Sequence, residues 1–102
     1  MKSYKHLVKY SLAKGHLISV FDGEIWEVKR STSYKDIIDC IESVEEAQIN
    51  IRDKDDNKMG WAHIIPFGLA DDETVSDYTC TEYMEAWDVF YDKSPNAIAL
   101  AD

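Results

Sequence analysis

Residues 47–65 of the chain, which read AQINIRDKDDNKMGWAHII, decide the fold. Within residues 47–52 apolar and polar side chains alternate with a period of two, which predicts a β-strand with one covered and one wetter face. The polar stretch 53–57 predicts a turn, and residues 58–65 predict a returning strand that ends before Pro66. We therefore expect this region to form an antiparallel hairpin.

A second hairpin is predicted upstream, over residues 16–30. Its first strand leads into Asp22-Gly23, which is among the strongest short hairpin signals. In the returning strand Trp26 and Val28 are expected to share one face, with Trp26 in the hydrophobic core.

Three helices are predicted from apolar residues that recur three and four positions apart. They cover residues 3–14, about 34–44 and about 80–92, and a capping box at residues 79–82 marks the start of the last one. Trp87, on the apolar side of that helix, is expected in the core. Residues 66–76 are expected to form a loop.

The predicted order of elements is α-ββ-α-ββ-α, which indicates an α+β fold. We expect a four-stranded, mostly antiparallel sheet built from two hairpins, with the helices packed on one face. A chain of 102 residues fits one domain. The domain is predicted to span residues 1–93, followed by a short C-terminal tail at residues 94–102.

The net charge of −9 is unevenly distributed. Residues 1–14 contain four lysines and no acidic residue, whereas residues 71–102 contain nine acidic residues and one lysine. Because nucleic acids and anionic membranes repel such a chain, we expect direct binding to neither. The expected partner is a protein with a basic surface, for which a nucleic-acid-binding protein is one candidate, and a homodimer is an alternative.

The sequence predicts a soluble, cytoplasmic protein. No apolar run approaches the roughly 20 residues of a membrane helix, and the N-terminus lacks the apolar core of a signal peptide. Two cysteines are too few for a disulfide framework. Cys40 is expected to be a buried free thiol, and a bridge to Cys80 is the less favoured alternative.

No catalytic residue, cofactor or metal site is predicted. Residues 53–57 place oxygen ligands as in the first half of a calcium loop. However, Lys58 stands where the loop requires Gly, and Ile64 stands where it requires a bidentate Glu. A polar turn is therefore favoured. The histidines and cysteines lack paired ligand spacing. The four glycines are scattered and form no phosphate-binding loop.

Two surfaces are candidate partner-binding sites. The first is a stripe of carboxylates spaced three, three and four residues apart on the last helix, with four more in the stretch before it. These residues are Glu82, Glu85, Asp88 and Asp92 on the helix, and Asp71, Asp72, Glu73 and Asp77 before it. The stripe is about 15 Å long and could imitate the phosphates of one DNA strand. The alternative is a solvated helix face that keeps the protein soluble.

The second candidate surface consists of Arg52, Trp61 and His63. If Ala62 and Ile64 point into the core, Trp61 and His63 lie on the opposite face, beside Arg52. Trp and Arg are favoured anchors of protein interfaces. The favoured alternative is a half-buried strand in which a neighbouring residue satisfies His63.

Residues 22–31 (DGEIWEVKRS), 60–62 (GWA), 65–68 (IPFG) and 73–78 (ETVSDY) resemble small accessory proteins of tailed bacteriophages. The resemblance covers residues 16–92 and brings no activity or functional residue with it. It implies a gene product that acts in the cytoplasm of an infected bacterium, where small acidic phage proteins often bind and inhibit a host protein.

The leading hypothesis is therefore a non-enzymatic phage accessory protein that binds and inhibits or modulates a host protein through an acidic, DNA-mimicking surface. One alternative is a self-associating or virion-assembly protein. Another is a small enzyme of unknown class.

Overall fold

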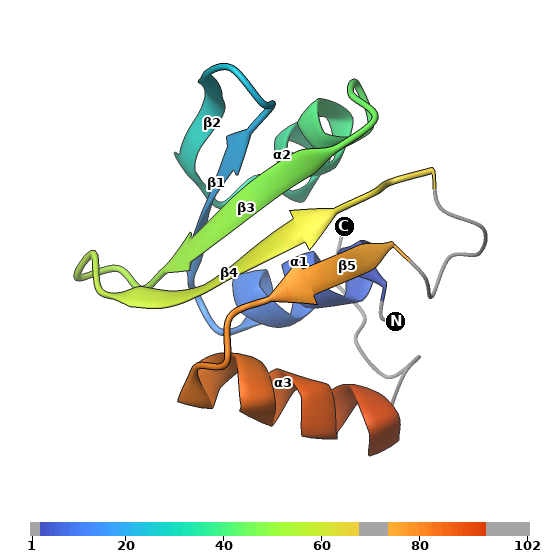
Figure 1. Cartoon of the computed structure of the whole chain (residues 1–102). Helices are drawn as coiled ribbons and strands as arrows, with labels where there is room; N and C mark the ends of the chain where they lie inside the picture. Colours follow the sequence, from blue (N-terminus) through green and yellow to red (C-terminus); the bar gives the residue numbers. More distant parts are fainter. Residues whose placement is uncertain (1–2, 68–73, 94–102) are drawn as a thin grey trace.

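The computed structural model describes residues 3–67 and 74–93. They form an α+β fold in which every neighbouring pair of strands is antiparallel and the strand order is β2-β1-β3-β4-β5 (Figure 1). In chain order the elements are α1 (Tyr4–Ala13), β1 (Leu17–Phe21), β2 (Trp26–Ser31), α2 (Tyr34–Ile41), β3 (Ala47–Arg52), β4 (Lys58–Ile64), β5 (Val75–Tyr78) and α3 (Glu82–Lys93).

The fifth strand corrects the predicted four-stranded sheet and the order α-ββ-α-ββ-α. β5 pairs with β4, although its first two residues were expected to belong to a loop over residues 66–76. Four residues are too few to show a period of two clearly, and two of them, Ser76 and Asp77, are polar. The strand forms because the free edge of β4 offers unpaired backbone groups to a segment folded beside it.

The two hairpins form at the predicted places. The side chain of Asp22 accepts hydrogen bonds from the backbone N–H groups of Glu24 and Ile25, and Gly23 adopts a φ of 106° that favours glycine. In the β3–β4 turn the Asp53 carboxylate accepts from the backbone of Asp55 and Asn57. This arrangement confirms a polar turn at residues 53–57.

The hydrophobic core lies between one face of the sheet and all three helices. In β3 the buried residues alternate with half-buried ones, as the period of two predicts. The sheet contributes Ile18, Val20, Ile49, Ile51, Ala62 and Ile64 to the core, and the helices contribute Leu7, Val8, Ile37, Ile41, Met84 and Trp87. Among the described residues, no helix lies on the other face of the sheet (Figure 1).

Gly60 lets α3 pack closely against β4. A Cβ atom at this position would lie 2.5 Å from both Cγ and Sδ of Met84, which is fully buried. This contact joins the last helix to the sheet, and Trp87 extends it by packing edge-on against Tyr78 of β5.

Trp26 is not in the core, contrary to the prediction. Its side chain is 37% exposed and packs against Phe21 on the helix-free face, with ring centroids 5.2 Å apart. The register between β1 and β2 shifts at Glu27, so Trp26 and Val28 do not share a face as expected. A β-bulge of this kind depends on strand pairing and breaks the alternation from which the prediction was made.

The helix ends differ from their predicted positions in detail. α2 ends at Ile41 rather than near residue 44, and Ser33 caps it as predicted by accepting from the backbone N–H of Asp36. α3 begins at Glu82, where Thr81 accepts from the backbone N–H of Met84. Both cysteines are free thiols, and Cys40 is half-buried rather than buried.

Candidate functional site

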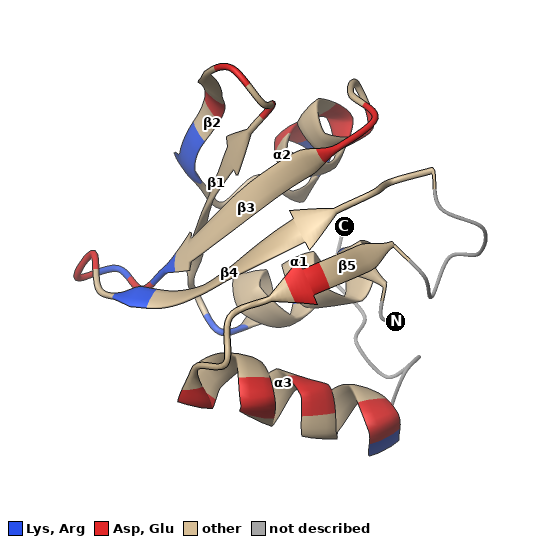
Figure 2. Cartoon of the chain, in the orientation of Figure 1, with Lys and Arg blue, Asp and Glu red and all other residues tan. Residues whose placement is uncertain are grey.

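The exposed side of α3 carries the predicted stripe of carboxylates, here called the acidic face. It consists of Glu82, Glu85, Asp88 and Asp92, seen as red bands along α3 in Figure 2. Asp88 is half-buried and the other three are exposed. The helix therefore places all four predicted residues on one element at its solvent side.

The four other acidic candidates do not extend this face. Asp77 is exposed on β5, but it pairs with His63, whose side chain lies on the helix-free face of the sheet. The structure thus assigns Asp77 to a different surface from α3. Asp71, Asp72 and Glu73 lie outside the described residues.

An apolar residue interrupts the acidic face. Val89 is 55% exposed and lies one helical turn after Glu85 and one turn before Asp92. Ala86 is also exposed. Sequence reasoning treated the stripe as purely ionic and missed Val89, although its position between Glu85 and Asp92 on a helix was readable from the spacing.

The acidic face borders a hollow between α1, β4 and α3. The hollow has a volume of about 580 Å³, and its lining includes Glu82 and Ala86 together with the apolar surfaces of Tyr10, Met59 and Tyr83. Lys14 stands at its edge with its ammonium group 4.8 Å from the centre of the Tyr10 ring. A concave apolar surface with charged residues at its rim is the usual anatomy of a protein-binding site.

Glu82 and Glu85 form no ion pair with a basic side chain among the described residues. Both lie in the first turn of α3, where the positive end of the helix dipole favours acidic side chains. They therefore stabilise the helix and at the same time leave their charge available to a partner.

The helix-free side of the sheet, here called the open face, carries the second candidate surface. Ala62 and Ile64 are fully buried, so Trp61 and His63 point to the open face. Its half-buried or exposed side chains include Phe21, Trp26, Gln48, Asn50, Arg52, Trp61 and His63. The structure thus brings all three predicted residues to one face.

Neighbours hold the side chains of the second candidate surface in place. The Trp61 indole N–H donates to Gln48 Oε1 over 3.2 Å. His63 Nδ1 contacts Ser76 Oγ, and His63 Nε2 lies 3.6 Å from the carboxylate of Glu46. The favoured alternative, a half-buried strand with His63 satisfied by its neighbours, describes this geometry.

The contact of His63 with Ser76 and Glu46 has the residue types of a serine-hydrolase triad. The Ser76 hydroxyl lies within hydrogen-bond distance of two acceptors, the backbone carbonyl of His63 at 3.2 Å and His63 Nδ1. When it donates to the carbonyl, Ser76 Oγ accepts from the Nδ1–H tautomer, and in that arrangement the imidazole does not activate Ser76 as a nucleophile.

An acidic hollow of about 530 Å³, which His63 lines, lies between the β1–β2 turn and the segment before β3. Its lining includes Asp22, Glu42, Glu45, Glu46, His63 and Phe67. Within residues 3–67 and 74–93 no three His, Cys, Asp or Glu side chains gather closely enough to hold a metal ion. This hollow therefore brings carboxylates together without forming a metal-binding cluster there.

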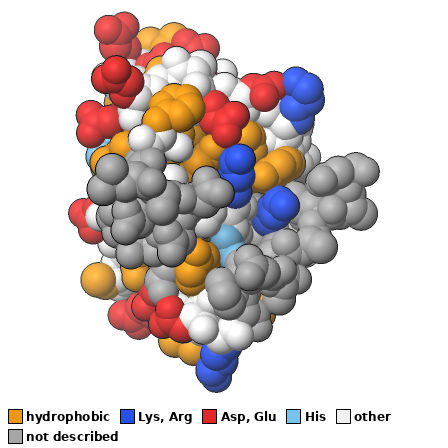
Figure 3. Space-filling model, turned by 90° about the vertical axis from the view of Figure 1, so that its right-hand side faces the viewer, with side chains coloured by type: hydrophobic (Ala, Val, Ile, Leu, Met, Phe, Trp, Pro, Cys, Tyr) orange, Lys and Arg blue, Asp and Glu red, His pale blue; other side chains and the backbone are white. Residues whose placement is uncertain are grey.

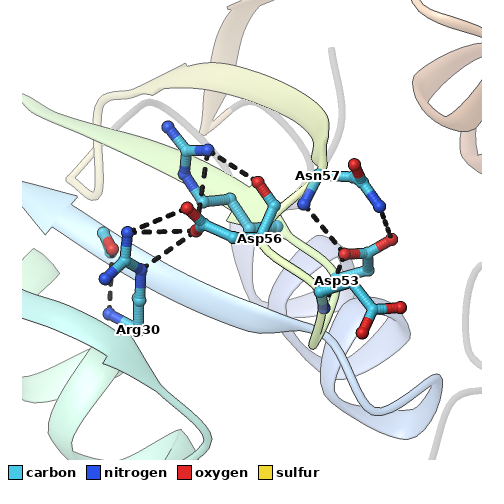
Figure 4. A network of polar contacts seen from close by, with 7 residues as sticks. Arg30, Asp53, Asp56 and Asn57 are labelled. Carbon is cyan, nitrogen blue, oxygen red and sulfur yellow. Dashed lines mark hydrogen bonds and ion pairs between the residues drawn. The ribbon is translucent and has the colours of Figure 1, made fainter.

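A third, basic region lies at the β2 side of the open face, and the sequence analysis did not identify it. Figure 4 shows its polar network: the guanidinium of Arg30 donates from Nε and Nη2 to the Asp56 carboxylate, each over 3.1 Å. Arg52 donates to the backbone oxygen of Asp56 over 3.0 Å. Lys29 lines the same region. No sequence signal pointed to it beyond the adjacency of two basic residues.

The turn beside this network is rigidly organised. Asn57 donates to the Asp53 carboxylate through its side chain and its backbone, and these bonds hold the pKa of Asp53 below its ordinary value of 3.8. The Asp53 carboxylate, the first of the oxygens that resembled calcium ligands, thus accepts hydrogen bonds within the turn.

Comparisons of the chain with models of protein families, with curated proteins and with solved structures found no significant match. Within the part of the chain that the structure describes, no helix combines the length and the apolar composition needed to cross a bilayer. The geometry of the three surfaces is therefore the basis for a functional proposal.

Proposed function

We propose that this chain is a non-enzymatic binding protein that docks a basic surface of a partner protein onto the acidic face of α3. One observation carries the proposal: Glu85 and Asp92 flank the exposed Val89, and Glu82 lines a mainly apolar hollow of about 580 Å³ beside them. Carboxylates alone would serve solubility. Carboxylates around an apolar centre match the hydrophobic core and polar rim of protein interfaces.

The charge of the chain favours a basic partner. Figure 2 shows that acidic residues predominate on α3, with Lys93 as the basic residue at its end. An oppositely charged partner would be steered to this face and would bind faster at low salt. Repulsion between like charges would keep acidic proteins from binding to this face.

The resemblance to small phage proteins suggests the setting. We propose a phage accessory protein that acts in the cytoplasm of the infected cell and inhibits or modulates a host protein. In the narrower version of this proposal the carboxylates imitate DNA phosphates and the target is a nucleic-acid-binding protein. The exposed Val89 favours a mixed apolar and ionic contact over a purely phosphate-like one.

The test is affinity capture from bacterial lysate with Glu85→Lys and a matched control, Asp36→Lys. Both residues are exposed acids in the first turn of a helix, so the two changes alter net charge and helix dipole equally. We expect a protein with a basic surface to be retained by the wild type and by Asp36→Lys, and to be lost with Glu85→Lys.

Retention should also weaken steeply as salt is raised, because the contact is ionic. Equal retention by both variants would show that α3 is not the docking surface. Loss with both variants would show that only net charge matters, and would equally contradict the proposal.

Self-association is the second candidate function, and the open face favours it. Trp26 and Phe67 are exposed. Trp61 is half-buried on the open face, on which the described residues place no helix. A dimer measured by light scattering and lost on Trp61→Ala would support this alternative. A monomer at all concentrations would exclude it.

A further inference from the structure

A β-bulge places two consecutive basic side chains on the same side of the sheet. Ile18 pairs with Ser31 and Val20 with Val28, so Ser19 alone faces both Lys29 and Arg30. In a regular strand consecutive side chains point to opposite faces. Here both line one hollow of about 280 Å³ on the open face.

The bulge holds Arg30 in an unfavourable backbone conformation. Its φ is 50°, in the left-handed region that a residue with a Cβ seldom occupies. Its N–H donates to Ser19 Oγ over 2.9 Å, and Asp56 fixes its guanidinium through two bonds. Backbone strain of this kind is concentrated at functional sites.

The hollow is positively charged although the chain as a whole is acidic. Lys29, Arg30 and Arg52 contribute three positive charges to its lining, and Asp56, which binds the two arginines, contributes one negative charge. Lys29 is exposed and forms no ion pair among the described residues. An anion could therefore contact Lys29 and the unoccupied donors of the two arginines.

The rest of the lining is suited to a planar ring and to hydrogen-bonding groups. Trp26 presents an exposed indole beside the cations, supported by Phe21. Ser19 and Asn50 add short polar side chains. An aromatic platform next to phosphate-binding cations is the arrangement that proteins use for single-stranded nucleic acids.

We propose that this hollow binds a nucleotide unit of single-stranded nucleic acid, with the base against Trp26 and the phosphate at Lys29, Arg30 and Arg52. The cross-strand register continues from Ser19 through Asn50 to Trp61. Trp61 on β4 thus offers a second ring three strands from Trp26, about 14 Å across the sheet, for a base farther along the strand. A duplex keeps its bases stacked inside and cannot use either ring.

The net charge of −9 had suggested that the chain does not bind nucleic acid directly. That expectation averages charge over the whole surface. Charges farther away than a Debye length of about 8–10 Å are largely screened at physiological salt. The local charge of the hollow therefore determines whether an anion is attracted to it. The proposal uses none of the residues of the acidic face, and either proposal can fail without the other.

The test is fluorescence anisotropy of a labelled oligothymidylate single strand at physiological ionic strength, about 0.15 M, where the Debye length is about 8 Å. The wild type is compared with Trp26→Ala, with Lys29→Gln and with the matched control Lys35→Gln, which removes an exposed lysine from α2 on the helical side. We expect saturable binding that both changes in the hollow weaken at least about fivefold. Lys35→Gln should bind within about twofold of the wild type, because surface charges beyond a Debye length are largely screened.

Two unlabelled competitors identify the ligand. Displacement by thymidine monophosphate would show that a single nucleotide suffices, and displacement by the oligonucleotide alone would show that a strand is required; both results support the site. Equal displacement by an oligoglutamate peptide would overturn the proposal in favour of an acidic protein partner.

Three further results would overturn it: the absence of saturable binding, equal weakening by Lys29→Gln and Lys35→Gln, or a dimer that Trp26→Ala disrupts. Near-ultraviolet circular dichroism of Trp26→Ala verifies that this variant is folded. Lys29→Gln changes an exposed side chain and tests the site independently of Trp26.

Discussion

At the scale of single residues, Trp26 and Trp87 show how much the environment of one side chain matters. Trp87 is fully buried, and its indole N–H donates to His6 Nδ1 over 3.0 Å. Its ring also packs edge-on against Tyr91. Trp26 lies on the open face and contacts mainly Phe21. The prediction that both rings lie in the core is therefore confirmed for Trp87 and wrong for Trp26.

We expect Trp87→Ala to lower the free energy of unfolding by about 3–5 kcal/mol, because it leaves a cavity and an unpaired buried acceptor on His6. Trp26→Ala should lower it by only about 1–2 kcal/mol, since this ring is 37% exposed at the surface and its removal leaves no enclosed cavity. Urea denaturation measures both. Similar losses for the two variants would contradict the placement of Trp26.

His16 is the residue whose titration should affect stability. Its Nδ1 lies 3.1 Å from the hydroxyl of Tyr83, which in turn donates to the fully buried Ser11. Burial lowers the pKa of His16 below its ordinary value of 6.5, and Lys14 lowers it further while Asp53 opposes the shift. Burial also raises the pKa of Tyr83, which keeps this hydroxyl protonated.

Because the pKa of His16 is lower in the folded state, the unfolded chain binds its proton more readily. Stability should be unaffected by His16 above its ordinary pKa and should fall as pH drops from about 7 to about 5. His16→Asn, which retains a donor near Nδ1, should make that fall shallower. Thermal unfolding across this range measures the difference, and parallel curves for the two proteins would refute the assignment.

At the scale of elements, the contact between β4 and α3 positions the acidic face. A Cβ atom at Gly60 of β4 would lie 2.5 Å from Met84, so only a residue without a side chain leaves room for it. The contact orients α3 so that Met84 and Trp87 face the core and the carboxylates face solvent.

We expect Gly60→Ala to lower the free energy of unfolding by about 1–3 kcal/mol, because the new methyl group overlaps Met84. In a Met84→Ala background the same change should cost much less, since the overlapping atoms are gone. A double-mutant cycle measured by chemical denaturation gives the coupling. An equal cost in both backgrounds would show that Met84 is not the obstacle.

Val89 tests what kind of contact α3 makes. If a partner buries its exposed side chain, Val89→Ser should weaken capture of that partner at least about fivefold, while Ile25→Ser, a matched change on the β1–β2 turn, should not. Serine and valine have similar helix propensities, so the helix itself should remain intact. Binding unaffected by Val89→Ser but lost with Glu85→Lys would instead favour the purely DNA-like version.

At the scale of the whole molecule, the acidic face and the basic hollow lie on different surfaces. Figure 3 shows a further side of the protein, on which basic and acidic side chains lie among apolar ones. The acidic face follows α3 on the helical side, and the basic hollow lies on the open face of the sheet. One small domain thus offers two chemically different surfaces.

The excess of acidic residues should also affect the stability of the whole chain. The ion pairs between described residues, such as Lys35–Asp39 and Arg30–Asp56, are exposed and contribute little. Repulsion from a net charge of −9 should dominate. Added salt should therefore raise the midpoint of thermal unfolding at pH 7, and this gain should vanish near the isoelectric point of about 4.6. A lower midpoint in salt at pH 7 would contradict this.

The sequence by itself determined the features that depend on neighbours along the chain. The alternation in residues 47–52, the turn at Asp22-Gly23 and the helical spacing of the carboxylates on α3 each follow from local backbone geometry. For that reason the α+β class, both hairpins, the buried Trp87 and the acidic stripe were predictable.

Only the tertiary structure decided what depends on pairing between distant segments. β5 is a strand because β4 lies beside it, and the bulge that turns Lys29 and Arg30 to one side exists only through pairing of β2 with β1. The same bulges moved Trp26 out of the core. Cross-strand register leaves no periodic trace in a single segment, and therefore the open face and its basic hollow became visible only when the sheet was assembled.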